Sequence, residues 1–197
     1  MSTKSIIVTP EIDDPLCQGD IFTNVKYNFI SKDSDDEIEI TELEFPMAII
    51  ISQACDVIFM DEMLKNKLGN SSKYMPSILM CPIYNYELSK NGKHLAEISN
   101  KTNISIIEDN TFNSSDKNIA NKDWHYRLHM LTLAEKGDKA NQIENASIDF
   151  KHYFTVPAKY LYDNKNNRIY KLDPIYSEQI TLKFATFLTR VGIPDEN

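Results

Sequence analysis

Alternating apolar and polar residues dominate the first half of the chain and predict β-strands. Residues 21–30 place their large apolar side chains mainly at odd positions, and residues 38–43 alternate with one acidic face. A period of two is typical of a strand with one buried face. Residues 46–52 are a continuous apolar run rich in β-branched side chains, which favours a central strand covered on both faces. Residues 77–81 predict a further short buried strand.

Two segments instead have the spacing of helices. Residues 57–68 are predicted to be helical, with Phe59, Met63 and Leu64 on one face and a stop at Gly69-Asn70. Near the C-terminus, Ser177 is expected to cap an amphipathic helix. The apolar stripe of this second helix consists of Ile180, Phe184, Phe187, Leu188 and Val191. Gly192 and Pro194 are expected to end the helix.

The middle of the chain has the weakest pattern. Residues 85–123 are rich in Asn, Ser and Lys and are interpreted as an insertion within one domain that spans residues 1–197. Residues 124–132 and 147–156 predict strands. Residues 160–162 and 168–172 predict a hairpin around a polar turn. The pattern as a whole predicts a mainly β (α+β) domain with two or three helices.

Composition narrows the class of protein. The chain has 197 residues, of which 42% are hydrophobic, and a formal net charge of −8, so it is long enough for a globular core. No apolar run is long enough to suggest a transmembrane helix, and the first ten residues do not resemble a secretory signal. Three cysteines without paired spacing suggest free thiols in a reducing compartment. We therefore expect a cytoplasmic protein that does not associate with membranes.

The charge is unevenly distributed along the chain. Residues 1–62 contain 14 acidic residues and three lysines, a balance of −11, whereas the remaining residues have a balance of +3. Proteins that bind nucleic acids need concentrated positive charge against the phosphate backbone. Nucleic-acid binding is therefore disfavoured. The simpler interpretation of the acidic residues is that they solvate exposed strands and loops.

Three segments together resemble the PemK/MazF-like toxins. These segments are Gln18–Phe22, residues 46–52 and residues 78–83. The resemblance implies an SH3-like, PemK-type β-barrel, here with an insertion and a C-terminal helix. Active members of that family cleave RNA as dimers, using an Arg at the entry of the central strand and a nearby Ser or Thr. Phe45 occupies the Arg position here, and Ser52 is the nearest equivalent of the hydroxyl, so the resemblance implies the fold more than the ribonuclease activity.

The chain also resembles a group of bacterial proteins that carry a Ser-Gln-x-Cys-Asp element after the central strand. That element is Ser52-Gln53-Ala54-Cys55-Asp56 in this sequence. A cysteine at a helix N-terminus can have a stabilised thiolate, so a hydrolase can be drawn with Cys55 as nucleophile, His125 as base and Asp149 as orienting group. The neighbouring Asp56 disfavours the thiolate. The simpler interpretation is that Asp56 caps the following helix while Cys55 packs in the core.

A second polar cluster consists of His125, Arg127 and His129. On a strand these three side chains share one face, which could bind an anion or an acidic protein surface. The alternative is that they pair with the acidic face of residues 38–43. Histidines four apart on a strand lie too far apart for one metal ion, so no metal site is expected.

No function is predicted for the other two histidines. His94 lies in the insertion and is expected to be solvated, and His152 is expected to be structural or on the surface. No phosphate-binding loop or dinucleotide fingerprint is present, so no cofactor is expected.

The leading hypothesis is a non-catalytic interaction module of a bacterial defence, toxin–antitoxin or regulatory system. It has a protein partner or forms a homodimer, and its candidate binding residues are Ser52, Gln53, Asp56, Arg127 and His129. The assignment to a bacterial defence, toxin–antitoxin or regulatory system follows from the resemblance alone. The alternatives are a Cys/His-dependent hydrolase and a diverged MazF-like endoribonuclease.

Overall fold

The structure is a computed structural model that describes residues 7–34, 37–90, 92–102, 128–133 and 143–189. Its strands are β1 (Ile7–Val8), β2 (Asp20–Ser34), β3 (Glu37–Ile50), β4 (Ser77–Asn85), β5 (Leu128–Leu133), β6 (Ile143–Asp149), β7 (Phe154–Pro157) and β8 (Arg168–Leu172). Its helices are α1 (Ala54–Asn66), α2 (Tyr86–Lys90), α3 (Ala96–Thr102), α5 (Ala158–Asp163) and α6 (Pro174–Thr189). Short 3₁₀ turns are η1 (Ser71–Lys73), η2 (Lys93–Leu95), η4 (Phe150–His152) and η5 (Lys165–Asn167).

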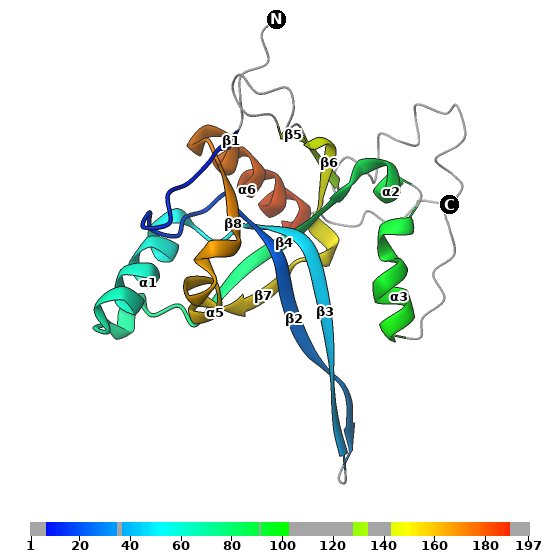
Figure 1. Ribbon diagram of the computed structural model, residues 1–197, viewed down its shortest axis with the longest axis horizontal. Coiled ribbons are helices and arrows are strands. Elements are labelled where there is room, and N and C mark those ends of the chain that lie inside the picture. Colours follow the sequence, from blue (N-terminus) through cyan, green and yellow to red (C-terminus); the bar gives the residue numbers. More distant parts are fainter. Residues whose placement is uncertain (1–6, 35–36, 91, 103–127, 134–142, 190–197) are drawn as a thin grey trace, which may run out of the picture.

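One antiparallel sheet organises the fold (Figure 1). Its strand order is β1-β8-β2-β3-β4-β6-β5, and β7 pairs with β4 beside β6. Every strand pair in the described chain is antiparallel. The predicted α+β class is confirmed. Since the path runs from β1 to β5 without the two ends pairing among the described strands, closure into a barrel is not shown.

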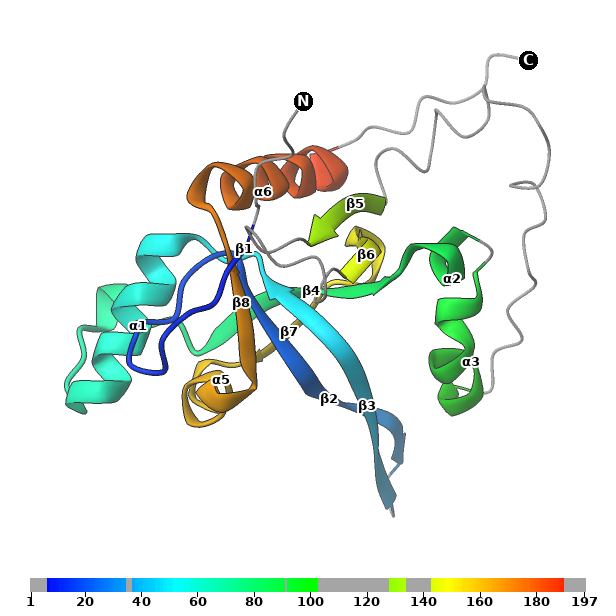
Figure 2. The same cartoon turned by 45° about the horizontal axis from the view of Figure 1, so that its top comes forward.

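Helices cover both faces of the sheet (Figure 2). Helix α6 packs on one face through Ile180, Phe184 and Phe187, and helices α1 and α5 cover the other. Neighbouring residues of β3 therefore enter different cores, with Ile49 on the α6 side and Ile50 on the α1 side. This confirms the prediction of a central strand buried on both faces. No helix among the described residues is long and apolar enough to cross a membrane.

Helix α1 confirms the predicted helix and the packing of Met63 and Leu64 on the core, but not the burial of Phe59. Val57 and Met60 are buried, whereas Phe59 is 38% exposed. The helix ends at the left-handed Lys67 (φ 52°), two residues before the predicted glycine. Its N-cap is Gln53, so the expectation that Asp56 caps it is wrong.

Helix α6 begins earlier than the sequence predicts. The Asp173 carboxylate accepts a hydrogen bond from the Ile175 N–H at 3.0 Å, which places Ser177 inside the helix and not at its cap. The predicted stripe is confirmed at Ile180, Phe184 and Phe187, but Leu188 is 52% exposed. Val191 and the terminating residues lie outside the described chain.

Two further predictions are corrected. Residues 160–162 belong to helix α5 and not to a hairpin strand. The predicted strand over residues 147–156 is divided by η4. In the predicted insertion, residues 86–90 and 96–102 form the helices α2 and α3. The predicted strand over residues 124–132 is described only from Leu128.

Strands β2 and β3 extend together well beyond the rest of the sheet (Figure 1). Their pairing runs from Ile21–Ile49 to Ser34–Glu37, with one bulge between Ile30 and Lys32. The acidic residues 31–37 between the two predicted strands suggest a turn, but residues 32–34 and 37 of this segment are paired. We call residues 26–44 the β2–β3 arm.

A buried ion pair fixes the N-terminal segment to β8. The Arg168 Nη1 lies 3.0 Å from the Asp20 Oδ2, and both side chains are almost completely buried. The same guanidinium donates to the backbone carbonyls of Glu11, Asp14 and Pro15. Burial raises the pKa of the Asp20 carboxyl, and the Arg168 charge opposes that rise. One side chain thus satisfies a buried carboxylate and three carbonyls.

Replacement of Arg168 by Ala is expected to lower the free energy of unfolding by about 3–5 kcal/mol, because it leaves a buried carboxylate without its partner. Urea denaturation followed by circular dichroism measures the change. Lys159→Ala is the control, since its ion pair with Asp163 is exposed and should contribute little. Equal losses in the two variants would contradict the structural role of Arg168.

Candidate metal centre

Strand β6 presents two polar side chains to the segment formed by α2 and η2. Ser147 and Asp149 lie two residues apart and therefore on the same face of the strand. The Ser147 hydroxyl donates to the Ser89 hydroxyl at 2.8 Å in a buried contact, which attaches α2 to the sheet. Helix α2 is also capped by the Asn85 side chain, whose Oδ1 accepts from the Glu87 N–H at 2.9 Å. This arrangement brings η2, and with it His94, next to Asp149.

The second half of the cluster arises where the edge pairing of β4 is interrupted. Strand β7 pairs with residues 77–80 of β4 and β6 pairs with residues 83–85, so Cys81 and Pro82 have no partner in either strand. Between β6 and β7 the chain forms the turn η4. The Asp149 Oδ1 caps this turn by accepting from the Lys151 N–H at 3.0 Å. His152, three residues after Asp149, is turned back toward the same carboxylate.

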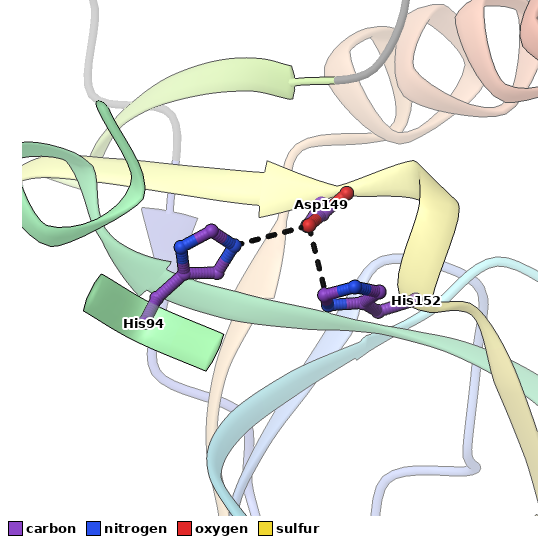
Figure 3. Close-up of side chains that lie close together, drawn as sticks. All are labelled: His94, Asp149 and His152. Atoms are coloured by element: carbon purple, nitrogen blue, oxygen red, sulfur yellow. Dashed lines mark hydrogen bonds and ion pairs between the residues drawn. The ribbon is translucent and has the colours of Figure 1, made fainter. Parts of the chain in front are cut away.

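Two imidazole rings meet one carboxylate oxygen in this cluster (Figure 3). The His94 Nε2 and the His152 Nδ1 each lie 3.2 Å from the Asp149 Oδ2. One potential ligand atom from each of the three residues lies within 4.8 Å of the other two. We call His94, Asp149 and His152 the His–Asp–His cluster.

The cluster is shielded from water. The side chains of His94 and Asp149 are 2% and 0% exposed, and that of His152 is 21% exposed. The Tyr84 ring lies edge-on to both imidazoles, with centroid distances of 4.7 Å to His94 and 6.3 Å to His152. A carboxylate removed from water requires charge-stabilising partners. Here His94 approaches from η2, and the Lys151 N–H and His152 approach from η4.

The geometry suits a divalent metal ion. Zinc binds imidazole nitrogen and carboxylate oxygen at about 2.0–2.2 Å, so neighbouring ligand atoms in a tetrahedral site are roughly 3.3 Å apart. The two measured separations of 3.2 Å match this spacing. Three protein ligands also leave a fourth position for water or substrate, as in catalytic zinc sites. Without a metal, the same residues form a hydrogen-bonded network around Asp149.

A mainly apolar pocket of about 390 Å³ adjoins the cluster, because His94 belongs to both. Tyr84, which packs against both imidazoles, also lines the pocket. Its walls are β3 and β4 on one side and α2, η2 and α3 on the other. Phe45, Met47 and Ile98 are among its apolar lining residues. The pocket gives the cluster a neighbouring space in which a small molecule fits.

The residues predicted from the Ser-Gln-x-Cys-Asp element lie elsewhere. Cys55 is exposed at the start of α1, so the expectation of a core thiol is wrong. Its Sγ lies 3.6 Å from the Asp56 Oδ1. The Ser52 hydroxyl oxygen accepts from the Leu79 N–H at 2.8 Å, which joins the end of β3 to β4. Gln53 is exposed at the N-cap of α1 without a capping side-chain bond.

The structure describes some of the residues predicted to act with Cys55 or to bind a partner, but not others. Asp149 is part of the His–Asp–His cluster. His125 and Arg127 lie outside the described residues, so the Cys55–His125–Asp149 arrangement stays a prediction. His129 lies on β5, where its backbone pairs with Ile148 of β6.

The expectation that His94 is solvated is wrong, because its side chain is 2% exposed. The separation of 55 residues between His94 and Asp149 contains no local signal. The spacing of Asp149 and His152 is a signal, since residues at i and i+3 around one turn can share a ligand. It could have identified two of the three members.

Comparison of the chain with models of protein families, with curated proteins and with solved structures found no match.

Cys81 provides a probe of the surroundings of Asp149. Burial, and secondly the negative charge of Asp149, raise the pKa of the Cys81 thiol. At mildly alkaline pH a thiol reagent is expected to modify the exposed Cys55 in the folded protein but Cys81 only in denaturant, because the thiolate is the reactive form. Peptide mapping by mass spectrometry identifies the modified residue. Rapid modification of Cys81 in the folded protein would contradict this environment.

Proposed function

We propose that the protein binds a divalent transition-metal ion at the His–Asp–His cluster and that this centre is its functional site. The observation that carries the proposal is the approach of two imidazole nitrogens to one fully buried carboxylate oxygen, each at 3.2 Å. The sequence predicts no metal, because the three residues are distant in the chain or inconspicuous. The proposal therefore rests on the fold.

The set of ligands narrows the choice of metal. Two imidazoles and one carboxylate suit zinc, and the same set with open positions is used by non-haem iron(II) centres. The absence of a thiolate from the cluster makes soft ions such as copper(I) poor candidates. A bound ion would supply Lewis acidity at the open position. The protein supplies the buried ligands and the adjoining pocket.

Burial favours an ion over an empty network. The Asp149 side chain has no exposed surface, and a divalent cation would supply more positive charge to a buried carboxylate than hydrogen bonds from imidazoles do. The His94 Nδ1 is buried without a hydrogen-bond partner among the described residues, whereas the Nε2 of the same ring contacts Asp149. That ring is thus oriented with Nε2 toward the shared position.

Metal-stripped protein is expected to bind one Zn²⁺ per chain, measured by calorimetry, and to develop visible absorption bands with Co²⁺. His94→Gln and His152→Gln should each weaken Zn²⁺ binding by at least about tenfold, because each removes one ligand nitrogen. Both substitutions retain a polar side chain, and circular dichroism reports whether the fold is intact.

Asp163→Asn is the matched control for Asp149→Asn, because Asp163 is an exposed carboxylate at the end of α5. Only the Asp149 variant should lose Zn²⁺ affinity. The proposal fails if folded wild-type protein binds no Zn²⁺, or if binding is unaffected by substitutions at all three cluster residues.

The β2–β3 arm favours a second candidate function, which is binding of a protein partner. Ile30 and Ile40 are directly paired across the arm, Ile38 is two residues further along, and these side chains are 59%, 66% and 64% exposed. Residues 26–44 also contain seven acidic residues and two lysines, a balance of −5. Apolar side chains among acidic ones suit a basic polypeptide that carries apolar residues.

A peptide of alternating Lys and Val is expected to bind the arm more tightly than one of alternating Glu and Val, and more weakly as salt is added. The double variant Ile30→Ser/Ile40→Ser should reduce that binding. Ile175→Ser/Leu182→Ser is its control, because both of these residues are similarly exposed but lie on α6. Fluorescence anisotropy measures the affinity, and sedimentation shows whether the arm instead joins two copies. Equal binding of the two peptides would contradict a basic partner.

The relationship to PemK/MazF-like proteins and their SH3-like barrel is also a proposal. It is supported by the position of the three resembling segments, which lie on or beside the adjacent strands β2, β3 and β4. Phe45, at the position of the family's arginine, is buried in the core and stacks on Phe154 at 4.4 Å between ring centroids. This environment does not favour ribonuclease chemistry there. A bacterial defence or toxin–antitoxin setting follows only from the resemblance.

A further inference from the structure

We infer that the pocket beside the His–Asp–His cluster binds a small aliphatic molecule whose oxygen-donor head group reaches the metal. The part of the inference that concerns the head group of the ligand rests on the proposed metal centre. The part that concerns its aliphatic chain follows from the pocket alone. His94 connects the two parts, because this residue lines the pocket and its Nε2 contacts Asp149.

The size and lining of the pocket define the aliphatic half. A volume of about 390 Å³ lies near the lower end of the roughly 300–1,000 Å³ that is usual for small-molecule sites. Leu43, Phe45 and Met47 from β3 face Leu88 and Ile98 from α2 and α3. An alkyl chain between these apolar side chains gains free energy by leaving water.

The charges at the pocket define the head group. Glu44, Lys93 and Glu97 line it, so the acidic side chains outnumber the basic one. The Glu97 carboxylate is 3.4 Å from the Lys101 Nζ, and Lys101 also donates to the backbone carbonyl of Glu42. An anionic head group is therefore poorly matched to the metal-free pocket. A divalent ion at the cluster reverses that balance, so a carboxylate should bind only to the metal-loaded protein.

Two helices hold the outer wall of the pocket against the sheet. Helix α2 is attached through the Ser89–Ser147 hydroxyl pair, and α3 through the Lys101 contact with β3. The pocket is consequently present before a ligand arrives. A preformed site loses less affinity to ordering than one that must close around its ligand.

The test uses linear alcohols and carboxylates with four to eight carbons, titrated calorimetrically into metal-free and Zn²⁺-loaded protein. The affinity for the alcohols should rise by about fourfold for each added CH₂, with or without metal. Octanoate should bind the Zn²⁺-loaded protein at least about tenfold more tightly than the metal-free protein, through the gained metal contact.

Leu88→Trp should weaken octan-1-ol binding by at least about tenfold, because the larger ring fills the pocket. Leu182→Trp is the matched control, since Leu182 is an exposed leucine on α6. If alcohol affinity does not depend on chain length, or if Leu88→Trp has no effect, the pocket assignment is overturned. If octanoate binds equally with and without Zn²⁺, the link between head group and metal is overturned. Failure to bind Zn²⁺ in the same titrations is a separate result that rejects the metal centre itself.

Discussion

The outer edge of β4 is the constraint on which the candidate site depends. One edge of this strand pairs with β3. The other edge is shared by β6 and β7, and on that edge Cys81 and Pro82 have no strand partner. Proline has no N–H to donate to a ladder, so pairing is weakest around it. The chain uses this gap to turn, and the turn brings Asp149 and His152 together. A continuous strand there would have sent residues 149 and 152 to opposite faces.

The cluster is assembled from elements that are each fixed by their own contacts. The carboxylate of Asp149 caps η4, Ser147 secures α2, and the left-handed Gly92 (φ 78°) precedes the turn that carries His94. Ligand side chains held in this way need little reorganisation when an ion binds. The same attachments form the outer wall of the apolar pocket. The side chains proposed as metal ligands and the pocket walls are therefore held by the same set of contacts.

The sequence predicted the fold class better than it predicted the site, for physical reasons. Strand periodicity and the apolar run over residues 46–52 reflect burial, which is a local property of side chains, and the structure confirms both. Helix boundaries were less accurate because Asp173 starts α6 through a side-chain hydrogen bond and Lys67 ends α1 in a left-handed backbone conformation. The His–Asp–His cluster depends on tertiary contacts, since His94 reaches Asp149 only after α2 has docked on β6. By contrast, the conspicuous Cys55 lies in the exposed first turn of α1.

The attachment of the N-terminal segment to Arg168 has a consequence for the order of assembly. Asp20 and its buried partner are separated by 148 residues, and the carbonyls that the guanidinium binds are more distant still. During synthesis β2, which begins at Asp20, leaves the ribosome well before Arg168, the residue that pairs with the buried Asp20 carboxylate. The N-terminal loop consequently cannot reach its final state until most of the chain has been translated. Contacts with such a large sequence separation slow folding, because the loop that they close is costly in entropy.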